Sequence, residues 1–212
     1  MTIEHKQRLY LGITMVLVAL SVGSISLYFS YQAIFEEKRL ELINIVKSRA
    51  RIVESVAEFD AKYSSSFPGG TTEATLNQIR NAHEKFEGFG ETGEFILAKL
   101  EADQIVFLLR HRHSKTTATN IPLNLISSEP MRRALKGESG VIIGLDYRGK
   151  KVLAAYEPVA VLNLGLVAKI DLTEIRAPFI KTGIMAGWGG AVYNSIRIIC
   201  FHTNQRTFNQ IH

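Results

Sequence analysis

Residues 140–171 read GVIIGLDYRGKKVLAAYEPVAVLNLGLVAKID, and this stretch decides the fold. It holds three largely apolar runs, Gly140–Leu145, Lys151–Glu157 and Leu164–Asp171, each of a length typical of a β-strand. The polar sequence Asp146-Tyr147-Arg148-Gly149 separates the first two runs and has the composition of a tight turn. Because short connections make neighbouring strands antiparallel, the stretch predicts three consecutive antiparallel strands.

Two more strands are predicted upstream of this stretch. Glu94–Leu100 and Gln104–Arg110 flank the polar turn Glu101-Ala102-Asp103, which favours a β-hairpin. The following segment, His111–Ile126, has no clean period and predicts a long surface loop. Ser128-Glu129-Pro130 then predicts a short helix with Ser128 as its cap. The sheet is therefore expected to have five strands.

Helical spacing dominates the chain before the sheet. From residue 32 to residue 63 apolar side chains recur at intervals of seven and three, and Arg49 interrupts the series. A second helix is predicted over Glu73–Glu87, capped by Thr71 or Thr72. Another helix is expected after Asp171, which together with Glu174 has the spacing of a capping box. The main members of the long stripe are Phe35, Leu42, Ile45, Ile52, Val56, Phe59 and Tyr63.

An uncharged apolar run, Leu9–Tyr31, precedes the long helical pattern. About 20 apolar residues are enough for a helix to cross the hydrocarbon core of a bilayer. Lys6 and Arg8 lie just before the run, and positive residues beside a span tend to remain cytoplasmic. We therefore expect an uncleaved plasma (inner) membrane anchor with a cytoplasmic N-terminus. The alternative is a signal peptide that is cleaved near Val22-Gly23-Ser24.

The charge balance argues against nucleic acid as a partner. The whole chain has a formal net charge of +5, yet residues 32–178 contain 20 Lys and Arg against 19 Asp and Glu. The excess lies at the two ends of the chain, and no predicted helix or strand carries a continuous basic stripe. The single cysteine, Cys200, lies in the C-terminal tail, so the central domain must rely on a packed core and has no disulfide.

Six short segments, taken in order, resemble the extracytoplasmic Cache domains of bacterial transmembrane sensors. The resemblance extends over about residues 32–179 and implies an α+β, PAS-like fold, in which a long N-terminal helix packs on the antiparallel sheet. It also implies a domain that binds a small molecule outside the membrane and is followed by a kinase, cyclase or chemoreceptor output module. The segments are Gly88–Glu94, Val106–Arg112, Glu129–Leu135, Asp146–Gly149, Val152–Pro158 and Leu166–Asp171.

The C-terminal part departs from that pattern. Residues 180–201 are expected to form a second, degenerate membrane segment, because Arg197 interrupts the apolar run. Residues 202–212 form a polar tail. The predicted organisation is thus a cytoplasmic N-terminus over 1–8, a transmembrane helix over 9–31 and the sensor-like domain over 32–179. The degenerate membrane segment over 180–201 and the polar tail over 202–212 follow it. We interpret the chain as a truncated or frame-shifted sensor without its output module.

Two groups of side chains are candidates for ligand binding. Arg110 and Arg112 share one face if the second strand continues, and paired guanidinium groups bind carboxylate or phosphate well. Tyr156 lies on the second strand of the opening stretch, while Lys169 and Asp171 share a face of the third. An acid and a base beside a tyrosine suit an amino acid or another small carboxylate. The alternatives are surface arginines and a cross-strand ion pair.

Two further residues complete the candidate set for ligand binding, and two histidines are considered as metal ligands. Tyr147 lies in the turn and is expected to cover the pocket, and Met131 on the short helix would supply an adaptable apolar wall. His111 and His113 have the spacing of two metal ligands on a strand, but no carboxylate or thiol pattern completes a metal site. No metal and no cofactor is therefore predicted.

Known enzyme signatures are missing from the chain, so catalysis is not expected. The sequence instead favours a membrane-anchored sensory input module that works as a homodimer through helix 35–63. Two alternatives stay open. The output module could belong to a separate chain, or the protein could be a structural or interaction component of the cell envelope that binds no ligand.

Overall fold

The computed structural model describes residues 3–86, 88–109, 112, 120–125 and 128–183. The chain divides into two units. One unit comprises residues 28–175, and the other comprises residues 1–27 together with 176–212. The larger unit contains the whole sheet and is described first.

The sheet has six antiparallel strands in the order β3-β2-β1-β6-β5-β4. This confirms an α+β fold with a long N-terminal helix and an antiparallel sheet. The bounds of the strands are β1 Glu94–Glu101, β2 Gln104–Phe107, β3 Ile121–Pro122, β4 Gly140–Leu145, β5 Lys151–Val159 and β6 Leu164–Asp171.

The expected number of five strands was wrong because of β3. This two-residue strand pairs with the outer edge of β2, where Gln104 faces Pro122 and Ile105 faces Ile121. So short a strand leaves no periodic pattern in the sequence, and its proline is tolerated because β3 lies at the edge of the sheet. The strand falls inside the segment that was predicted to be a loop.

The two turns read from the sequence are tight turns in the structure. In the β1–β2 turn, Ala102 and Asp103 have φ values of 45° and 61°, as a two-residue hairpin with the right-handed strand twist requires. In the β4–β5 turn, Asp146 Oδ1 accepts hydrogen bonds from the backbone N–H groups of Arg148 and Lys150, both at 2.9 Å. Gly149 supplies the positive φ of 72° that closes this turn.

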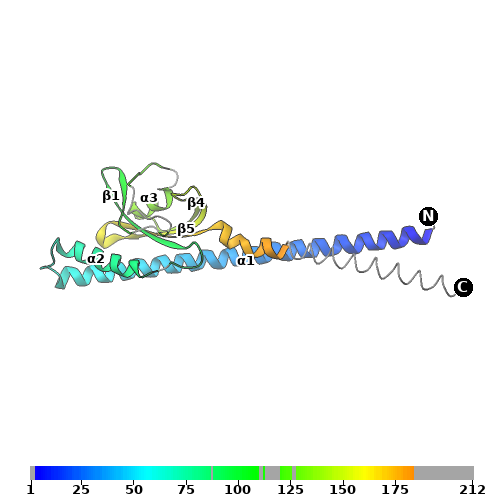
Figure 1. Ribbon diagram of the computed structural model, residues 1–212, viewed down its shortest axis with the longest axis horizontal. Helices are drawn as coiled ribbons and strands as arrows, with labels where there is room; N and C mark the ends of the chain where they lie inside the picture. The colour runs from blue at the N-terminus through cyan, green and yellow to red at the C-terminus, as the bar shows by residue number, and fades with distance from the viewer. Residues whose placement is uncertain (1–2, 87, 110–111, 113–119, 126–127, 184–212) are drawn as a thin grey trace. The chain divides into compact units, whose positions relative to one another are not determined.

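The long helix α1 (Ile3–Tyr63) contributes its residues 28–63 to this unit, where they cover one face of the sheet, and α2 (Gly70–Glu84) lies alongside the last turns of α1 (Figure 1). Helix α2 begins earlier than predicted and is preceded by Gly69 at φ 91° instead of a threonine cap. Asp60 joins the two helices, because its carboxylate accepts hydrogen bonds from Thr75 at 2.8 Å and Gln78 at 3.0 Å.

Helix α3 (Glu129–Leu135) packs on the other face of the sheet (Figure 1). The Ser128 hydroxyl does not cap it, but donates to the carbonyl oxygens of Leu123 and Leu125 at 2.8 and 2.6 Å. After β5, the short 3-10 helix η2 (Ala160–Leu162) leads into β6.

Residues 172–183 are helical, as expected after Asp171. The proposed capping box does not form, because the Glu174 carboxylate turns to the loop before β1. It accepts hydrogen bonds from the backbone N–H groups of Glu91 and Thr92 at 2.9 and 2.8 Å, and from the Thr92 hydroxyl. The N–H of Asp171 donates to the same hydroxyl at 2.9 Å.

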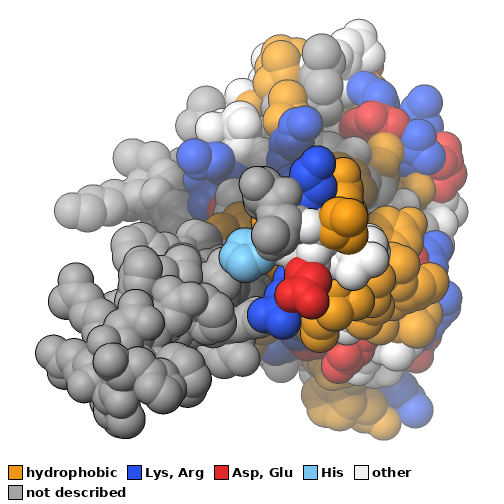
Figure 2. Space-filling model, turned by 90° about the vertical axis from the view of Figure 1, so that its right-hand side faces the viewer, with side chains coloured by type: hydrophobic (Ala, Val, Ile, Leu, Met, Phe, Trp, Pro, Cys, Tyr) orange, Lys and Arg blue, Asp and Glu red, His pale blue; other side chains and the backbone are white. Residues whose placement is uncertain are grey.

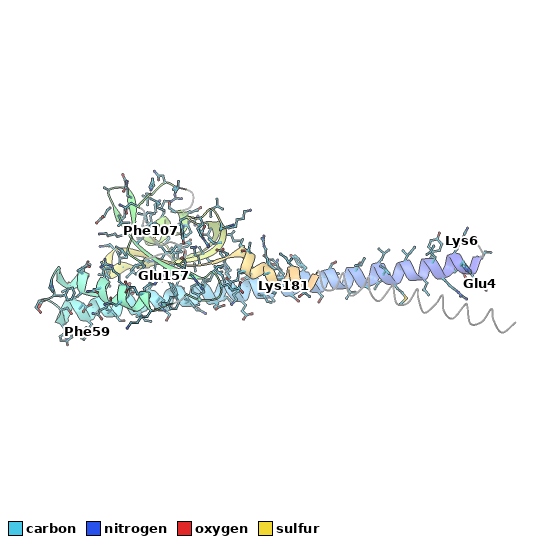
Figure 3. All side chains as sticks on the ribbon, viewed as in Figure 1. Glu4, Lys6, Phe59, Phe107, Glu157 and Lys181 are labelled. Atoms are coloured by element: carbon cyan, nitrogen blue, oxygen red, sulfur yellow. The ribbon has the colours of Figure 1, made fainter. Side chains whose placement is uncertain are left out.

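Alternate residues of the strands divide the core into two apolar clusters. One lies between the sheet and helices α1 and α2, with Leu42, Val46, Leu97 and Leu166 among its members. The other lies between the sheet and α3. Figure 3 labels Phe107, which belongs to the α3 cluster, and Phe59, which lies on the side of α1 away from the sheet.

The smaller unit contains the first part of α1. Within the described residues α1 is the one helix that is long and apolar enough to cross a membrane, with a mean hydropathy of 2.0 in its most apolar window and no burial there. Figure 2 views the N-terminal end of the chain and shows a broad hydrophobic surface beside a group of charged side chains. The second span expected over residues 180–201 lies mostly outside the described residues.

Candidate functional site

A cavity lies between the sheet, α3 and the β4–β5 turn. Its volume is about 30 Å³ in this conformation, which exceeds what one water molecule requires. Most of its wall is apolar and includes Ile96, Phe107, Met131, Val152, Ala154 and Val167. The polar groups at the cavity are Ser128, Asp146, Tyr147 and Lys169. Small-molecule sites are mostly apolar pockets with a few convergent polar groups, and this cavity has that composition on a much smaller scale.

Lys169 provides the cationic group of this cavity. Its side chain is only 2% exposed, and its Nζ lies 2.7 Å from Asp146 Oδ2 and 2.8 Å from Glu94 Oε1. The register of the sheet creates this contact, because Glu94 of β1 is the direct cross-strand partner of Lys169 on β6. An ammonium group has three donors, so two carboxylate contacts leave one N–H for another acceptor.

The charges extend beyond the cavity through Arg148. Its guanidinium Nε donates to Asp146 Oδ2 at 2.7 Å, and its terminal nitrogen donates to Asp171 Oδ1. The cluster therefore joins two cations, Lys169 and Arg148, to the three carboxylates of Glu94, Asp146 and Asp171. All three carboxylates are buried, so a formal excess of one negative charge is held away from water.

The ionisation of the cluster follows from these contacts. Burial alone raises the pKa of Asp146, but hydrogen bonds from Lys169 and from the Lys150 N–H outweigh it and hold the pKa below its ordinary value of 3.8. Burial raises the pKa of Tyr147, and the negative charge of Glu94 raises it further. Asp146 is thus ionised and Tyr147 is neutral near pH 7.

The structure brings together four of the seven residues predicted to bind ligand. Met131, Tyr147 and Lys169 line the cavity, and the Lys169 ammonium lies 5.0 Å from the centre of the Tyr147 ring. Asp171 does not line the cavity but joins the same cluster through Arg148.

The other three predicted residues lie elsewhere or are not described. Tyr156 faces α3 beyond the cavity lining, where its hydroxyl accepts a hydrogen bond from Arg133 at 3.4 Å. Arg112 donates to the carbonyl oxygens of Gly90 and Gly93 at 3.2 and 3.0 Å, so it braces the loop before β1. Arg110, like His111 and His113, lies outside the described residues.

Three residues of the cluster were not selected from the sequence. Asp146 and Arg148 were assigned only to a turn, although a turn between two buried strands can hold polar side chains against the end of the sheet. Glu94 opens a strand whose next five residues are mostly buried. A charged residue at the start of a buried strand indicates that it is paired with an opposite charge. Its partner could not be identified without the register of β1 on β6.

No family model matches the chain, and none of the curated proteins matches its sequence. Among solved structures, the chain is similar to the extracellular domains of two candidate histidine kinases, mmHK1S-Z2 and mmHK1S-Z3. The identities are 19 and 20%, and the TM-scores are 0.36 and 0.38. The matched regions cover 47 and 50% of this chain, but only 38 and 39% of those domains.

Proposed function

We propose that this chain is the input part of a membrane-anchored sensor, a Cache-type domain with a PAS-like sheet that binds a small extracytoplasmic molecule. The observation that carries the proposal is the cavity beside α3, in which a buried, ion-paired lysine meets a mostly apolar wall. Such a cluster is expensive to bury, so selection for packing alone favours apolar residues at these positions.

The ligand that suits this cavity has an apolar body and at least one hydrogen-bond acceptor for the third N–H of Lys169. A carboxylate or an amino acid meets this description. Because Asp146 and Glu94 already balance Lys169, a ligand carboxylate must compete with one of them. Movement of the β4–β5 turn follows directly from such competition, since Asp146 and Tyr147 both belong to it.

Ligand binding is tested with the full chain in lipid nanodiscs. Its melting temperature is followed by circular dichroism during a screen of amino acids, organic acids and purines, and a hit raises the melting temperature. Ala154→Val narrows the cavity and should abolish that rise. Ala155→Val is the matched control, because this neighbouring alanine is equally buried but faces α1.

The two variants separate ligand loss from general destabilisation. Each adds the same two methyl groups to a buried position of β5, so both are expected to lower the basal melting temperature to a similar degree. A ligand that stabilises Ala154→Val as strongly as the natural chain would place binding elsewhere. A screen in which no compound raises the melting temperature would favour the envelope-protein alternative.

We also propose that the protein acts as a homodimer through exposed apolar side chains of α1. Ile52 and Phe59 lie two helical turns apart and are 51% and 59% exposed, although part of Ile52 also faces a cavity between α1 and α2. Apolar side chains that recur every seven residues on an open helix face are typical of helix pairing.

Disulfide crosslinking tests this contact in membranes. Cys200 is first replaced by serine, and a new cysteine is then placed at Ile52 or Phe59. Both should give a covalent dimer under mild oxidation, whereas a cysteine at Lys47, on another side of the helix, should not. Equal crosslinking at all three positions would contradict the proposed interface.

The last part of the proposal concerns the orientation of the chain in the membrane. The apolar segment of α1 is proposed to be a membrane anchor with a cytoplasmic N-terminus and residues 32–179 outside. Labelling cysteines placed before and after this segment with a membrane-impermeant maleimide tests the orientation. Only the cysteine after the segment should react in intact cells.

A further inference from the structure

Arg49 breaks the apolar stripe of α1, and the structure shows that it faces two aromatic rings. The Arg49 guanidinium carbon lies 4.9 Å from the ring centre of Phe86, which follows α2, and 4.9 Å from that of Phe95 on β1. Among the described residues no carboxylate is paired with Arg49, although the side chain is half-buried. Stacking on aromatic rings uses the flat faces of a guanidinium and leaves its N–H donors, which lie in its plane, able to bind an anion.

Arg49 lies at the edge of a second cavity, on the opposite face of the sheet from Lys169. This cavity has a volume of about 90 Å³ and lies between α1, α2 and the sheet. Apart from Arg49 and His83 its wall is apolar, with Val53, Ile79, Leu97, Leu109 and Leu166 among the contributors. It is therefore three times as large as the cavity beside α3.

A more open groove adjoins this cavity and shares Arg49, Phe86 and Phe95 with it. Asn44 and Ser48 also line the groove, and both lie on α1 close to Arg49. A ligand head group at the guanidinium could thus accept further hydrogen bonds from an amide and a hydroxyl. The arrangement pairs one cation and two neutral polar groups with an apolar chamber behind them.

We propose that this cavity is a second ligand site, which binds a short-chain alkyl carboxylate. The carboxylate accepts paired hydrogen bonds from Arg49, and the alkyl chain enters the apolar cavity. An apolar cavity of roughly 150 Å³ can take up benzene, so the space here suits a few methylene groups, with the remaining atoms in the groove. The site does not depend on the proposed sensory role of the Lys169 cavity.

Binding of hexanoate to the full chain in nanodiscs tests the proposal. Equilibrium dialysis with radiolabelled hexanoate, corrected with empty nanodiscs, should show saturable binding of one molecule per chain. Arg49→Gln should weaken this binding about tenfold or more, because a charge-assisted pair of hydrogen bonds is lost. Arg51→Gln is the matched control, since it removes the same charge two residues further along α1 from an exposed side chain that pairs with Glu54.

A second variant probes the apolar part of the site. Ala82 lies on α2 at the edge of the cavity and is exposed, so Ala82→Phe adds a ring there with little risk to folding. This variant should also weaken hexanoate binding. In a separate competition experiment with the natural chain, unlabelled hexan-1-ol should displace hexanoate poorly, because it lacks the carboxylate.

Three outcomes would overturn the proposal. Hexanoate could show no saturable binding above empty nanodiscs, or Arg49→Gln and Arg51→Gln could bind it equally well. The third outcome is that Ala154→Val weakens binding while Arg49→Gln does not. That result would place hexanoate in the Lys169 cavity, and so would support the proposed sensory role while refuting the second site.

Discussion

The two faces of the sheet use the same strands for opposite purposes. On the α1 side, β6 contributes Leu166, Ala168 and Ile170 to an apolar core. On the α3 side, the same strand contributes Lys169, whose ammonium group contacts two carboxylates and lies near an aromatic ring at the wall of the cavity. Alternation along a single strand therefore separates an apolar face from a face that carries a buried cluster of charges.

The difference between the faces lies in what each cation contacts. Lys169 is deeply buried and neutralised by Glu94 and Asp146, so it is part of the folded framework. Arg49 is half-buried and stacks on two phenyl rings without a paired carboxylate among the described residues. Removing Lys169 should damage the fold, whereas removing Arg49 should chiefly affect what the protein can bind.

Loss of the buried lysine is expected to have the largest effect on stability. Lys169→Met leaves Glu94 and Asp146 buried without their shared ammonium, which costs about 3–5 kcal/mol in comparable sites. The free energy of unfolding, from urea titration of the full chain in nanodiscs, measures this. Lys99→Met on the exposed part of β1 is the control and should cost less than about 1 kcal/mol. An equal, small cost for both would refute the view that the cluster supports the fold.

The apolar face is tested by a cavity-creating change in α1. Leu42 is 2% exposed within the α1-side cluster, so Leu42→Ala should lower the free energy of unfolding by about 2–5 kcal/mol. Leu40→Ala serves as the control, because Leu40 is 54% exposed and should contribute within about 0.5 kcal/mol. If the two variants unfolded at the same urea concentration, α1 would not pack on the sheet as described.

Lowering the pH should destabilise the folded chain through Asp146 of the polar face, by less than the two substitutions above. The pKa of Asp146 is lower in the folded chain than its ordinary value of 3.8, so the folded state binds its proton less readily than the unfolded state. The stabilising contribution is therefore fully present above that value and is lost as the pH falls through the folded pKa.

The melting temperature, followed from about pH 5 to about pH 2.5 across the ordinary aspartate pKa of 3.8, measures this loss. Asp146→Asn removes the titrating group and should make the decline shallower. Asp60 also has a lowered pKa, mainly through its hydrogen bond from Ser64, so part of the decline should remain in that variant. An unchanged pH dependence would show that Asp146 does not contribute.

Much of the fold could be predicted from the sequence because its signals are local. The bounds of β4 and β6 agree with the prediction to the residue, and the helix over residues 32–63 is part of α1. Capping was predicted less well at Ser128 and at Glu174. Both side chains found partners in other segments, and a spacing rule cannot foresee such partners.

The candidate site was only partly predictable for a related reason. Lys169 was noticed because it shares a face of its strand with Asp171, and Tyr147 because it lies in the turn before the next strand. Glu94 was not, because its role depends on the register that places it opposite Lys169. Arg49 was noticed only as an irregularity, and its two aromatic partners come from separate elements.

The sequence by itself determined the elements of this protein, since periodicity, turn residues and an uncharged apolar run all act within a few residues. It also determined that Lys169 lies on the opposite face of its strand from Ala168 and Ile170. Only the tertiary structure decided which charges meet and where space remains. Ion pairs and cavities arise where distant segments come together, and no local pattern records the distance between them.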